Sequence, residues 1–463
     1  MASAIDAAMA TAARLYRSGD LQAARSTCEG ILQADARHFY ALHLASTIAL
    51  REGRGADCVA LATRALHVDP DHPEVLSNRG AGLRTMCRFA EALADYERAL
   101  SVAPGSPGPL VGRGVALAAL GRFGDAIACY DAALAIDPAN ARTRYNRGLS
   151  HLALGHYREG WADYESRWAG GENPMLPRPF DMPEFRDADW GKGHRTALWT
   201  EQGLGDQLLF ASLAADFAAL GEAFVLEIDA RLVAPLKRAH PEWHVVANAQ
   251  SAAAFAACDR HLALASAGRF LRNSAASFAR QPRALLAPDP LRTGHYRELL
   301  ARTPGRPIGV SWRTFQPTRR YYELSKSAPL AAFGAMAKAP DVRLVDLQYG
   351  DTGAEREDFA RQGGRLERIE GLDLFNDIDG VLAAMHACEA VVTTSNVTAH
   401  LAGSIGKRTL LVYPRANPPF HYWVPDDAGR SRWYPSVQIV TGVELDTWER
   451  VLERARDMLG EGI

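Results

Sequence analysis

The stretch AVVTTSNVTAHLAGSIGKRTLLVYP, residues 390–414, decides the fold of the last third of the chain. Residues 390–394 are apolar and mostly β-branched, which is typical of a buried parallel strand. Residues 397–405 are small and apolar and predict one short helix, and residues 409–412 predict a second buried strand. The stretch is therefore a strand–helix–strand unit of a parallel α/β sheet.

Polar side chains crowd the predicted start of this helix, namely Thr394, Ser395, Asn396, Thr398 and His400. In parallel α/β sheets, ligands bind beyond the carboxyl ends of the strands, close to helix N-termini. The free amides and the helix dipole favour an anion at that place. The pattern predicts either a seat for a phosphate or diphosphate, or an ordinary capped helix with a histidine that faces the core.

Composition limits the classes of function. The 463 residues are enough for two or three domains, and the net charge of −2 gives no basic footprint for nucleic acid. We expect neither a membrane span nor a signal peptide, because no apolar run is long enough and the chain does not begin with a basic segment followed by an apolar one. The six cysteines are scattered without a C-x-x-C pair, which predicts no zinc site, no disulfide framework and a cytoplasmic protein.

The first third of the chain is an internal repeat. Four sets of residues recur at intervals of 34 positions: Pro70, Pro104 and Pro138; Gly80, Gly114 and Gly148; Ala65, Ala99 and Ala133; and Tyr96, Tyr130 and Tyr164. This period, the small-residue slots and the closing proline resemble tetratricopeptide repeats. We expect about five helix pairs in a superhelical domain over residues 1–169, with turns at Gly19, Gly53, Gly121 and Gly155 and with Cys87 in the equivalent place of the third unit.

Stacked helix pairs of this kind bury a shared core and form a groove. The groove is expected to hold a protein or peptide partner, and the alternative is a scaffold or an oligomerisation element. The Gly/Pro-rich residues after the repeats predict a linker, which we assign to 170–190.

The middle third opens with a glycine loop. Residues 196–200 predict a strand that runs into EQGLGDQ, residues 201–207, and further strands and helices alternate up to about residue 290. This is a Rossmann-like domain over residues 191–292. The third glycine of a dinucleotide fingerprint is absent, so we reject a nicotinamide site, although Gly203 and Gly205 allow close approach of a ligand.

The last third, residues 293–463, repeats the architecture. Residues 308–312 predict a strand, and the loop behind it carries the cations Arg313, Arg319, Arg320 and Lys326. Because these cations follow the carboxyl end of a strand, their position favours binding of a phosphate. The alternative is that the loop is only solvated and its cations bind no ligand. We expect two Rossmann-like domains that face a cleft.

The motifs EQGLGDQ, VSWR, VDLQ and TAHLAG-x-x-GK resemble glycosyltransferases of the GT-B fold. The resemblance is greatest to the bacterial group that joins tetratricopeptide repeats to a domain similar to lipopolysaccharide heptosyltransferases. The plan is also similar to that of protein O-linked N-acetylglucosamine transferases and flagellin glycosyltransferases.

The resemblance implies roles for particular residues. Asp206 matches the aspartate that acts on the acceptor and would be the catalytic base, and Lys326 matches a lysine that contacts the donor phosphate. Many members of the group carry Asp where this chain has Ser395. We expect the nucleotide-sugar donor to be bound by Gly203, Gly205, Gln207, Ser311, Arg313, Lys326, Gln348, Ser395, Asn396, Val397, Thr398 and His400.

The expected function is therefore glycosyl transfer from a nucleotide sugar to a hydroxyl, with inversion and without a metal or other cofactor. The acceptor would be a protein of the flagellin type that the repeats recruit. Two alternatives stay open: an acceptor in lipopolysaccharide or another glycan, and an inactive scaffold that binds partners through its repeats.

Overall fold

The computed structural model describes residues 2–169, 177–315, 326–339, 341–414, 420–442 and 446–460. The chain divides into two compact units, and the boundary between them lies at Ser150–His151. Each unit is described by itself.

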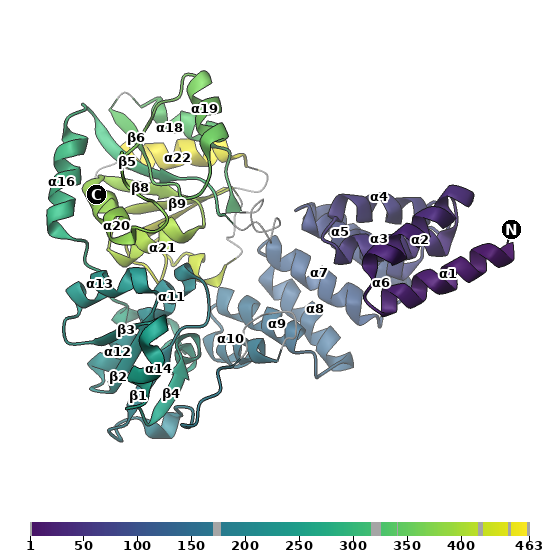
Figure 1. Ribbon diagram of the computed structural model, residues 1–463, viewed down its shortest axis with the longest axis horizontal. Coiled ribbons are helices and arrows are strands. Elements are labelled where there is room, and N and C mark those ends of the chain that lie inside the picture. Colours follow the sequence, from purple (N-terminus) through teal and green to yellow (C-terminus); the bar gives the residue numbers. More distant parts are fainter. Residues whose placement is uncertain are drawn as a thin grey trace. The chain divides into compact units, whose positions relative to one another are not determined.

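The first unit consists of antiparallel helix pairs (Figure 1, purple to blue). The pairs are α1 with α2, α3 with α4, α5 with α6, and α7 with α8, and each pair packs on the next. The helices are α1 (Ala2–Arg17), α2 (Leu21–Ala34), α3 (Phe39–Arg51), α4 (Gly55–Leu66), α5 (Pro73–Thr85), α6 (Phe89–Val102), α7 (Pro107–Ala119), α8 (Phe123–Ile136) and α9 (Ala141–Ala153), of which α9 crosses the boundary.

The recurring glycines and tyrosines explain the pairing of these helices. A Cβ atom on Gly114 would lie 2.6 Å from Cε1 of Tyr130, and one on Gly80 would lie 3.0 Å from Cε1 of Tyr96. The ring of each repeat thus occupies the space that a side chain at its glycine would need, which ties the 34-residue spacing to close helix packing.

The turns within the repeats follow the expectation from the sequence. Gly19, Gly53, Gly121 and Gly155 all have positive φ angles between 73° and 86°. Cys87, which replaces glycine in the third unit, is held at a φ of 60°. A side chain is strained in this left-handed region, so the turn geometry is imposed by the packing of the two helices.

The second unit contains two parallel sheets, and the first has four strands in the order β3-β2-β1-β4. Its strands are β1 (Arg195–Trp199), β2 (Ala223–Ile228), β3 (His244–Ala247) and β4 (Arg260–Ala263). Its helical segments are α11 (Leu204–Ala211), α12 (Ala214–Ala219), α13 (Ala230–Ala239), η3 (Asn248–Gln250), α14 (Ser251–Phe255), η4 (Leu264–Ala267), α15 (Gly268–Leu271) and η5 (Ala275–Arg280).

The second sheet has six parallel strands in the order β10-β9-β8-β5-β6-β7. Its strands are β5 (Arg306–Ser311), β6 (Val342–Asp346), β7 (Leu366–Glu367), β8 (Ala390–Thr393), β9 (Thr409–Tyr413) and β10 (Val437–Thr441). Its helical segments are α16 (Pro290–Ala301), η6 (Leu330–Phe333), α18 (Gly334–Ala337), α19 (Gly353–Arg361), α20 (Ile378–Ala387), α21 (Val397–Ser404), η7 (His421–Trp423) and α22 (Trp448–Gly460).

Both sheets have a Rossmann-type strand order. Counted from β5, the second sheet reads 3-2-1-4-5-6, and the first sheet reads 3-2-1-4. The direction in which successive strands are added to the sheet therefore reverses between β1 and β4 in the first sheet and between β5 and β8 in the second. Crevices at such reversal points are the usual ligand sites of open α/β sheets.

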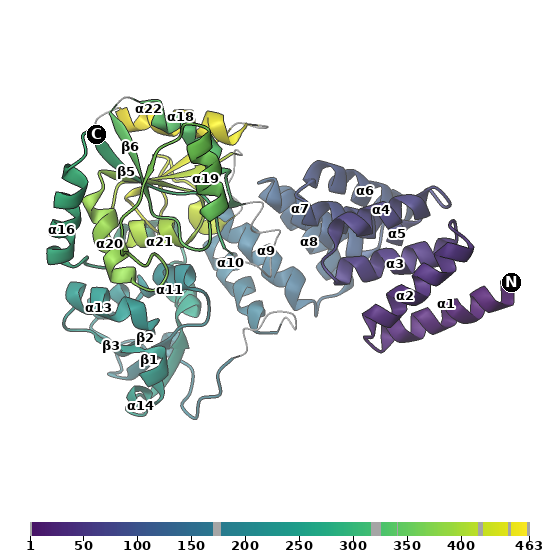
Figure 2. The ribbon, with the colours of Figure 1, turned by 45° about the horizontal axis from the view of Figure 1, so that its top comes forward.

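Strand alternation sorts the side chains of β5. Ile308, Val310 and Trp312 belong to the core that α18 and α22 cover, so Ser311 points to the opposite face. On that face, α20 and α21 of the second sheet contact α13 and α11 of the first (Figure 2). An ion pair between Arg238 and Asp379, with contacts of 2.8 and 3.0 Å, joins α13 to α20.

Residues 151–169 belong with the α/β unit, although the repeat pattern of the sequence continues through them. They form α10 (Tyr157–Tyr164) and η1 (Glu165–Trp168). Trp161 lies in this segment, and its Nε1 donates a hydrogen bond of 2.8 Å to the carbonyl of Arg272. The part of the expected linker that the structure describes is also ordered, because Phe185 donates a hydrogen bond of 2.8 Å to His261 in β4 and η2 (Asp187–Asp189) follows it.

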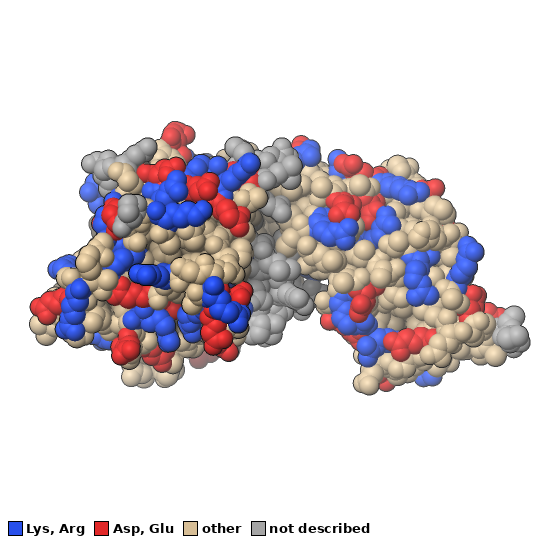
Figure 3. Space-filling view, turned by 90° about the horizontal axis from the view of Figure 1, so that it is seen from above, with Lys and Arg blue, Asp and Glu red and all other residues tan. Residues whose placement is uncertain are grey.

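None of the described helices is long and apolar enough to cross a membrane. All six cysteines are free. On the face in Figure 3, acidic and basic side chains are interspersed rather than gathered by sign.

Candidate functional site

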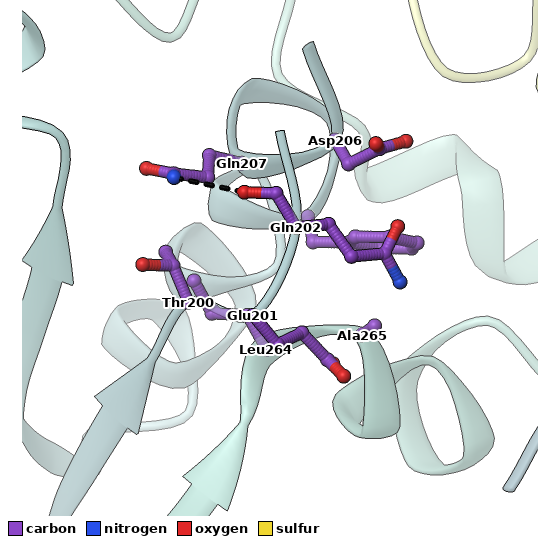
Figure 4. A pocket seen from close by; sticks show the side chains of 8 residues that line it. Thr200, Glu201, Gln202, Asp206, Gln207, Leu264 and Ala265 are labelled. Atoms are coloured by element: carbon purple, nitrogen blue, oxygen red, sulfur yellow. Dashed lines mark hydrogen bonds between the residues drawn. The ribbon is translucent and has the colours of Figure 1, made fainter. Parts of the chain in front are cut away.

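The first candidate site is a small pocket at the reversal point of the first sheet (Figure 4). It is lined by Thr200, Glu201, Gln202, Asp206, Gln207 and Phe210, which follow β1, and by Leu264 and Ala265, which follow β4. In Figure 4, Asp206 and Gln207 diverge from neighbouring positions of α11. Gln207 holds the loop, because it donates to the carbonyl of Gln202 at 3.0 Å and accepts from the amide of Asp229 at 2.9 Å.

Asp206 has an unusual electrostatic environment. Burial raises its pKa from 3.8 to about 6, against the attraction of Lys326 and with a further contribution from the charge of Glu201. Glu201 itself is paired with Arg167 through two contacts of 2.9 Å. A carboxylate with this pKa binds and releases a proton close to neutral pH, which is a property of general acids and bases.

His400 on α21 reaches the first sheet across a close helix contact. A Cβ atom on Gly205 would lie 2.9 Å from Cδ2 of His400, so glycine is needed there for α11 and α21 to meet. On its other side, Nδ1 of His400 lies 3.0 Å from the hydroxyl of Tyr434. Burial, helped by the charge of Lys326, lowers the pKa of His400 to about 3, so the imidazole is neutral at pH 7.

Lys326 carries a positive charge that acts on both Asp206 and His400. Its Nζ also lies 3.7 Å from the centre of the Phe420 ring, which is a cation–π contact. The structure therefore brings together Gly205, Asp206, Lys326 and His400, which come from both sheets.

The second candidate site is the start of α21, at the reversal point of the second sheet. Asn396 caps the helix, since its Oδ1 accepts from the amide of Thr398 at 2.9 Å. Its Nδ2 donates to Oγ of Ser311 at 2.9 Å, which joins the end of β5 to the helix. Thr398 Oγ1 lies 3.2 Å from the same hydroxyl. Asn396 is thus confirmed as a cap, and Ser311, Asn396 and Thr398 form one buried network.

Gln348 follows the neighbouring strand β6 and fixes the end of β5. Its Oε1 accepts three hydrogen bonds, from Oγ of Ser311 at 2.9 Å and from the amides of Trp312 and Arg313 at 2.9 and 2.8 Å. Because its acceptor is fully used, Gln348 positions the backbone in this structure and is not turned toward a ligand.

Three further groups at the start of α21 are engaged with the protein itself. Tyr349 is mostly buried, which raises its pKa, while the neighbouring hydroxyl of Thr314 and the amides of Phe315 and Val397 oppose that rise. Ser395 Oγ accepts from Nε1 of Trp423 at 3.0 Å. Arg313 pairs with Glu355 on α19. The Val397 amide, which would meet an anion, therefore lies beside the Tyr349 hydroxyl.

The expected site residues thus fall into two groups. Gly203, Gly205, Asp206 and Gln207 lie at the start of α11, while Ser311, Arg313, Gln348 and residues 395–398 lie around the start of α21. His400 and Lys326 connect the groups, and Arg319 and Arg320 lie outside the described residues.

The aromatic residues that surround His400 were not predicted from the sequence. His400 packs against Tyr422, Trp423 and Tyr434, with ring centroids 4.9–5.6 Å apart. The only signal for them was the aromatic content of the segments HYW, residues 421–423, and WY, residues 433–434.

Comparison with known proteins identifies the repeats and finds a curated relative of part of the chain. The family described as TPR repeat matches residues 114–155. The chain carries tetratricopeptide repeats. A curated relative is Protein FlbA of Caulobacter vibrioides, 30% identical over 316 residues, which are 63% of this chain and 52% of that protein. The chain spans about half the length of this relative.

Solved structures match part of the chain with low TM-scores. The MamA protein is 16% identical and matches with a TM-score of 0.33 over 39% of this chain and 100% of its own. PilW, described as a widely conserved type IV pilus biogenesis factor, is 21% identical and matches with a TM-score of 0.34 over 37% of this chain and 79% of its own.

Proposed function

We propose that the α/β unit is a GT-B glycosyltransferase that moves a sugar from a nucleotide-sugar donor to a hydroxyl acceptor. The observation that carries the proposal is the environment of Asp206. This half-buried carboxylate, whose pKa is raised to about 6, lies in a pocket at one reversal point and within the field of Lys326, where α11 and α21 meet.

The reaction needs a base for the acceptor hydroxyl and positive potential for the leaving diphosphate. Asp206 accepts the proton of the hydroxyl as the oxygen attacks the anomeric carbon, while the bond from that carbon to the diphosphate breaks. The departing diphosphate is stabilised by the positive charge of Lys326 and by hydrogen bonds from the amides at the start of α21. The neutral His400 provides a further hydrogen-bonding group.

The acceptor is proposed to be a protein. Tetratricopeptide repeats are suited to holding an extended peptide, which favours a protein as the acceptor. Transfer of labelled sugar to a protein band rather than to a lipid extract distinguishes this acceptor from lipopolysaccharide.

The test is a screen of UDP-, ADP-, GDP- and CMP-sugars by thermal shift and by release of nucleotide diphosphate. One donor class should raise the melting temperature and be turned over. Asp206→Asn should keep donor binding and lose turnover by about 10²–10⁴-fold. Asp187→Asn, at an exposed position of η2, is the matched control and should retain turnover. Full activity of Asp206→Asn would contradict the assignment of the base.

A second function is favoured by the start of α21. The Tyr349 hydroxyl lies beside the Val397 amide, and Ser395 is bonded to Trp423, so both groups at this end already face protein atoms. A repeat protein that only binds partners would have such a closed site. The absence of binding to every nucleotide sugar in the screen, together with retained binding of a protein partner, would establish this second function.

A further inference from the structure

Three metal-ligating side chains converge in the repeat unit, apart from the candidate site. His43 lies in α3, His72 directly precedes α5, and Glu74 lies in the first turn of α5. One ligand atom from each lies within 4.8 Å of the other two. Nε2 of His43 is 3.8 Å from Oε2 of Glu74, and the two imidazole centroids are 5.3 Å apart.

The packing of two repeats fixes this convergence. One helical turn after His43 and Glu74, Nδ2 of Asn78 donates to Oγ1 of Thr47 at 2.9 Å. Residues four apart share a helix face, so this hydrogen bond aligns the same faces of α3 and α5 that carry His43 and Glu74. The approach of the two ligands therefore follows from the stacking of successive repeats and does not depend on a loop.

The neighbouring repeat provides an internal comparison for His72. His38 occupies the same register 34 positions earlier, and its Nδ1 caps α3 by accepting from the amide of Ala41 at 3.2 Å. His72 makes no such cap to α5. Among the described residues, its Nδ1 is buried without a hydrogen-bond partner. The imidazole of His72 is thus not committed to its helix and is available as a ligand.

The donor set suits a transition metal. Two imidazoles with one carboxylate are a known ligand set of Zn²⁺, with bonds of about 2.0–2.1 Å, which puts ligand atoms roughly 3.3 Å apart in a tetrahedron. The 3.8 Å distance is close to this value, and Glu74, whose side chain is 75% exposed, is free to rotate inward.

We propose that His43, His72 and Glu74 form a divalent transition-metal site, best suited to Zn²⁺, that fastens α3 to α5. Three protein ligands leave a fourth position for water or for a side chain of a bound partner. This site is separate from the proposed sugar-transfer site, so the two proposals succeed or fail independently.

The test is isothermal titration of the full chain with Zn²⁺, supported by visible spectra of the Co²⁺ form. We expect one saturable site for each chain and a tetrahedral Co²⁺ spectrum. Glu74→Ala and His43→Gln should each weaken binding by at least tenfold, since each removes one of three ligands. Circular dichroism and melting without metal establish that the variants are folded.

Two controls remove histidines elsewhere. His67→Gln changes an exposed histidine at the end of α4, and the double variant His151→Gln/His156→Gln removes a pair whose Nδ1 atoms lie 3.2 Å apart. Both controls should retain wild-type affinity. The proposal is overturned if the titration shows no saturable site, if folded Glu74→Ala binds as tightly as the wild type, or if the His151/His156 variant loses the binding instead.

Discussion

The charge of Asp206 should make the α/β unit less stable at neutral pH than a variant without that charge. The pKa of Asp206 is raised from 3.8 to about 6, mainly by burial. A difference of this size corresponds to about 3 kcal/mol between the two protonation states. Above pH 6 the folded unit therefore holds an unfavourable negative charge, whereas the unfolded chain holds the same charge in water.

The sign of the pH dependence follows from proton binding. Between about pH 4 and pH 6 the folded state binds the proton and the unfolded state does not, so the contribution of Asp206 to stability improves as the pH falls through about 6. Asp206→Asn should be more stable than the wild type by up to about 3 kcal/mol at pH 7.5, and this advantage should vanish near pH 4.

The assay is calorimetry of the full chain at several pH values, with the transition of the α/β unit followed separately because a two-unit chain need not unfold in one step. Asp187→Asn is again the control and should show no pH-dependent difference from the wild type. The reasoning is refuted if Asp206→Asn is no more stable than the wild type at pH 7.5, or if its advantage does not change with pH.

Three further predictions concern packing and backbone geometry. Gly114→Ala places a Cβ atom 2.6 Å from the Tyr130 ring and should destabilise the repeat unit by about 1–3 kcal/mol in urea unfolding, while Gly30→Ala, with open space around it in α2, should not destabilise it. Cys87→Gly removes a side chain from a φ of 60° and should leave the melting temperature unchanged or raise it, and a lower value would mean that the thiol contributes more than the strain costs. Gln348→Met deprives three donors of their acceptor and should cost at least about 2 kcal/mol in the α/β unit, so a change below about 0.5 kcal/mol would contradict the clamp role.

The parts of the structure that the sequence predicted are those with a local or periodic signal. The 34-residue spacing predicted the helix pairs, because each turn and each glycine–tyrosine contact recurs at the same offset. The cap at Asn396 and the strands on either side of α21 were predicted for the same reason, since caps and buried strands depend on a few adjacent residues. Even the left-handed turn at Cys87 followed from its register with four glycines.

The parts that could not be predicted depend on residues that are distant in the sequence. Gly205 was expected to admit a ligand, yet the space in front of its Cα is filled by His400 from the other sheet. Gln348 was expected to bind the donor, yet its acceptor is used by the end of β5. The group of His43, His72 and Glu74 has no motif spacing, so only the stacking of α3 on α5 reveals it.

Tyr349 at the start of α21 offers a test that separates the two proposed functions. Its hydroxyl lies beside the Val397 amide, so a diphosphate that binds this amide competes with the phenol. A contact between the neutral groups is worth at most about 1 kcal/mol, whereas a charge-assisted hydrogen bond to the diphosphate is roughly twice as strong, so the exchange is favourable if the phenol finds solvent. The tyrosine therefore raises the affinity threshold for a donor without abolishing the site. Removing its hydroxyl alone, while the ring stays in place, would strengthen donor binding in an enzyme and would change nothing in a scaffold that binds no nucleotide sugar.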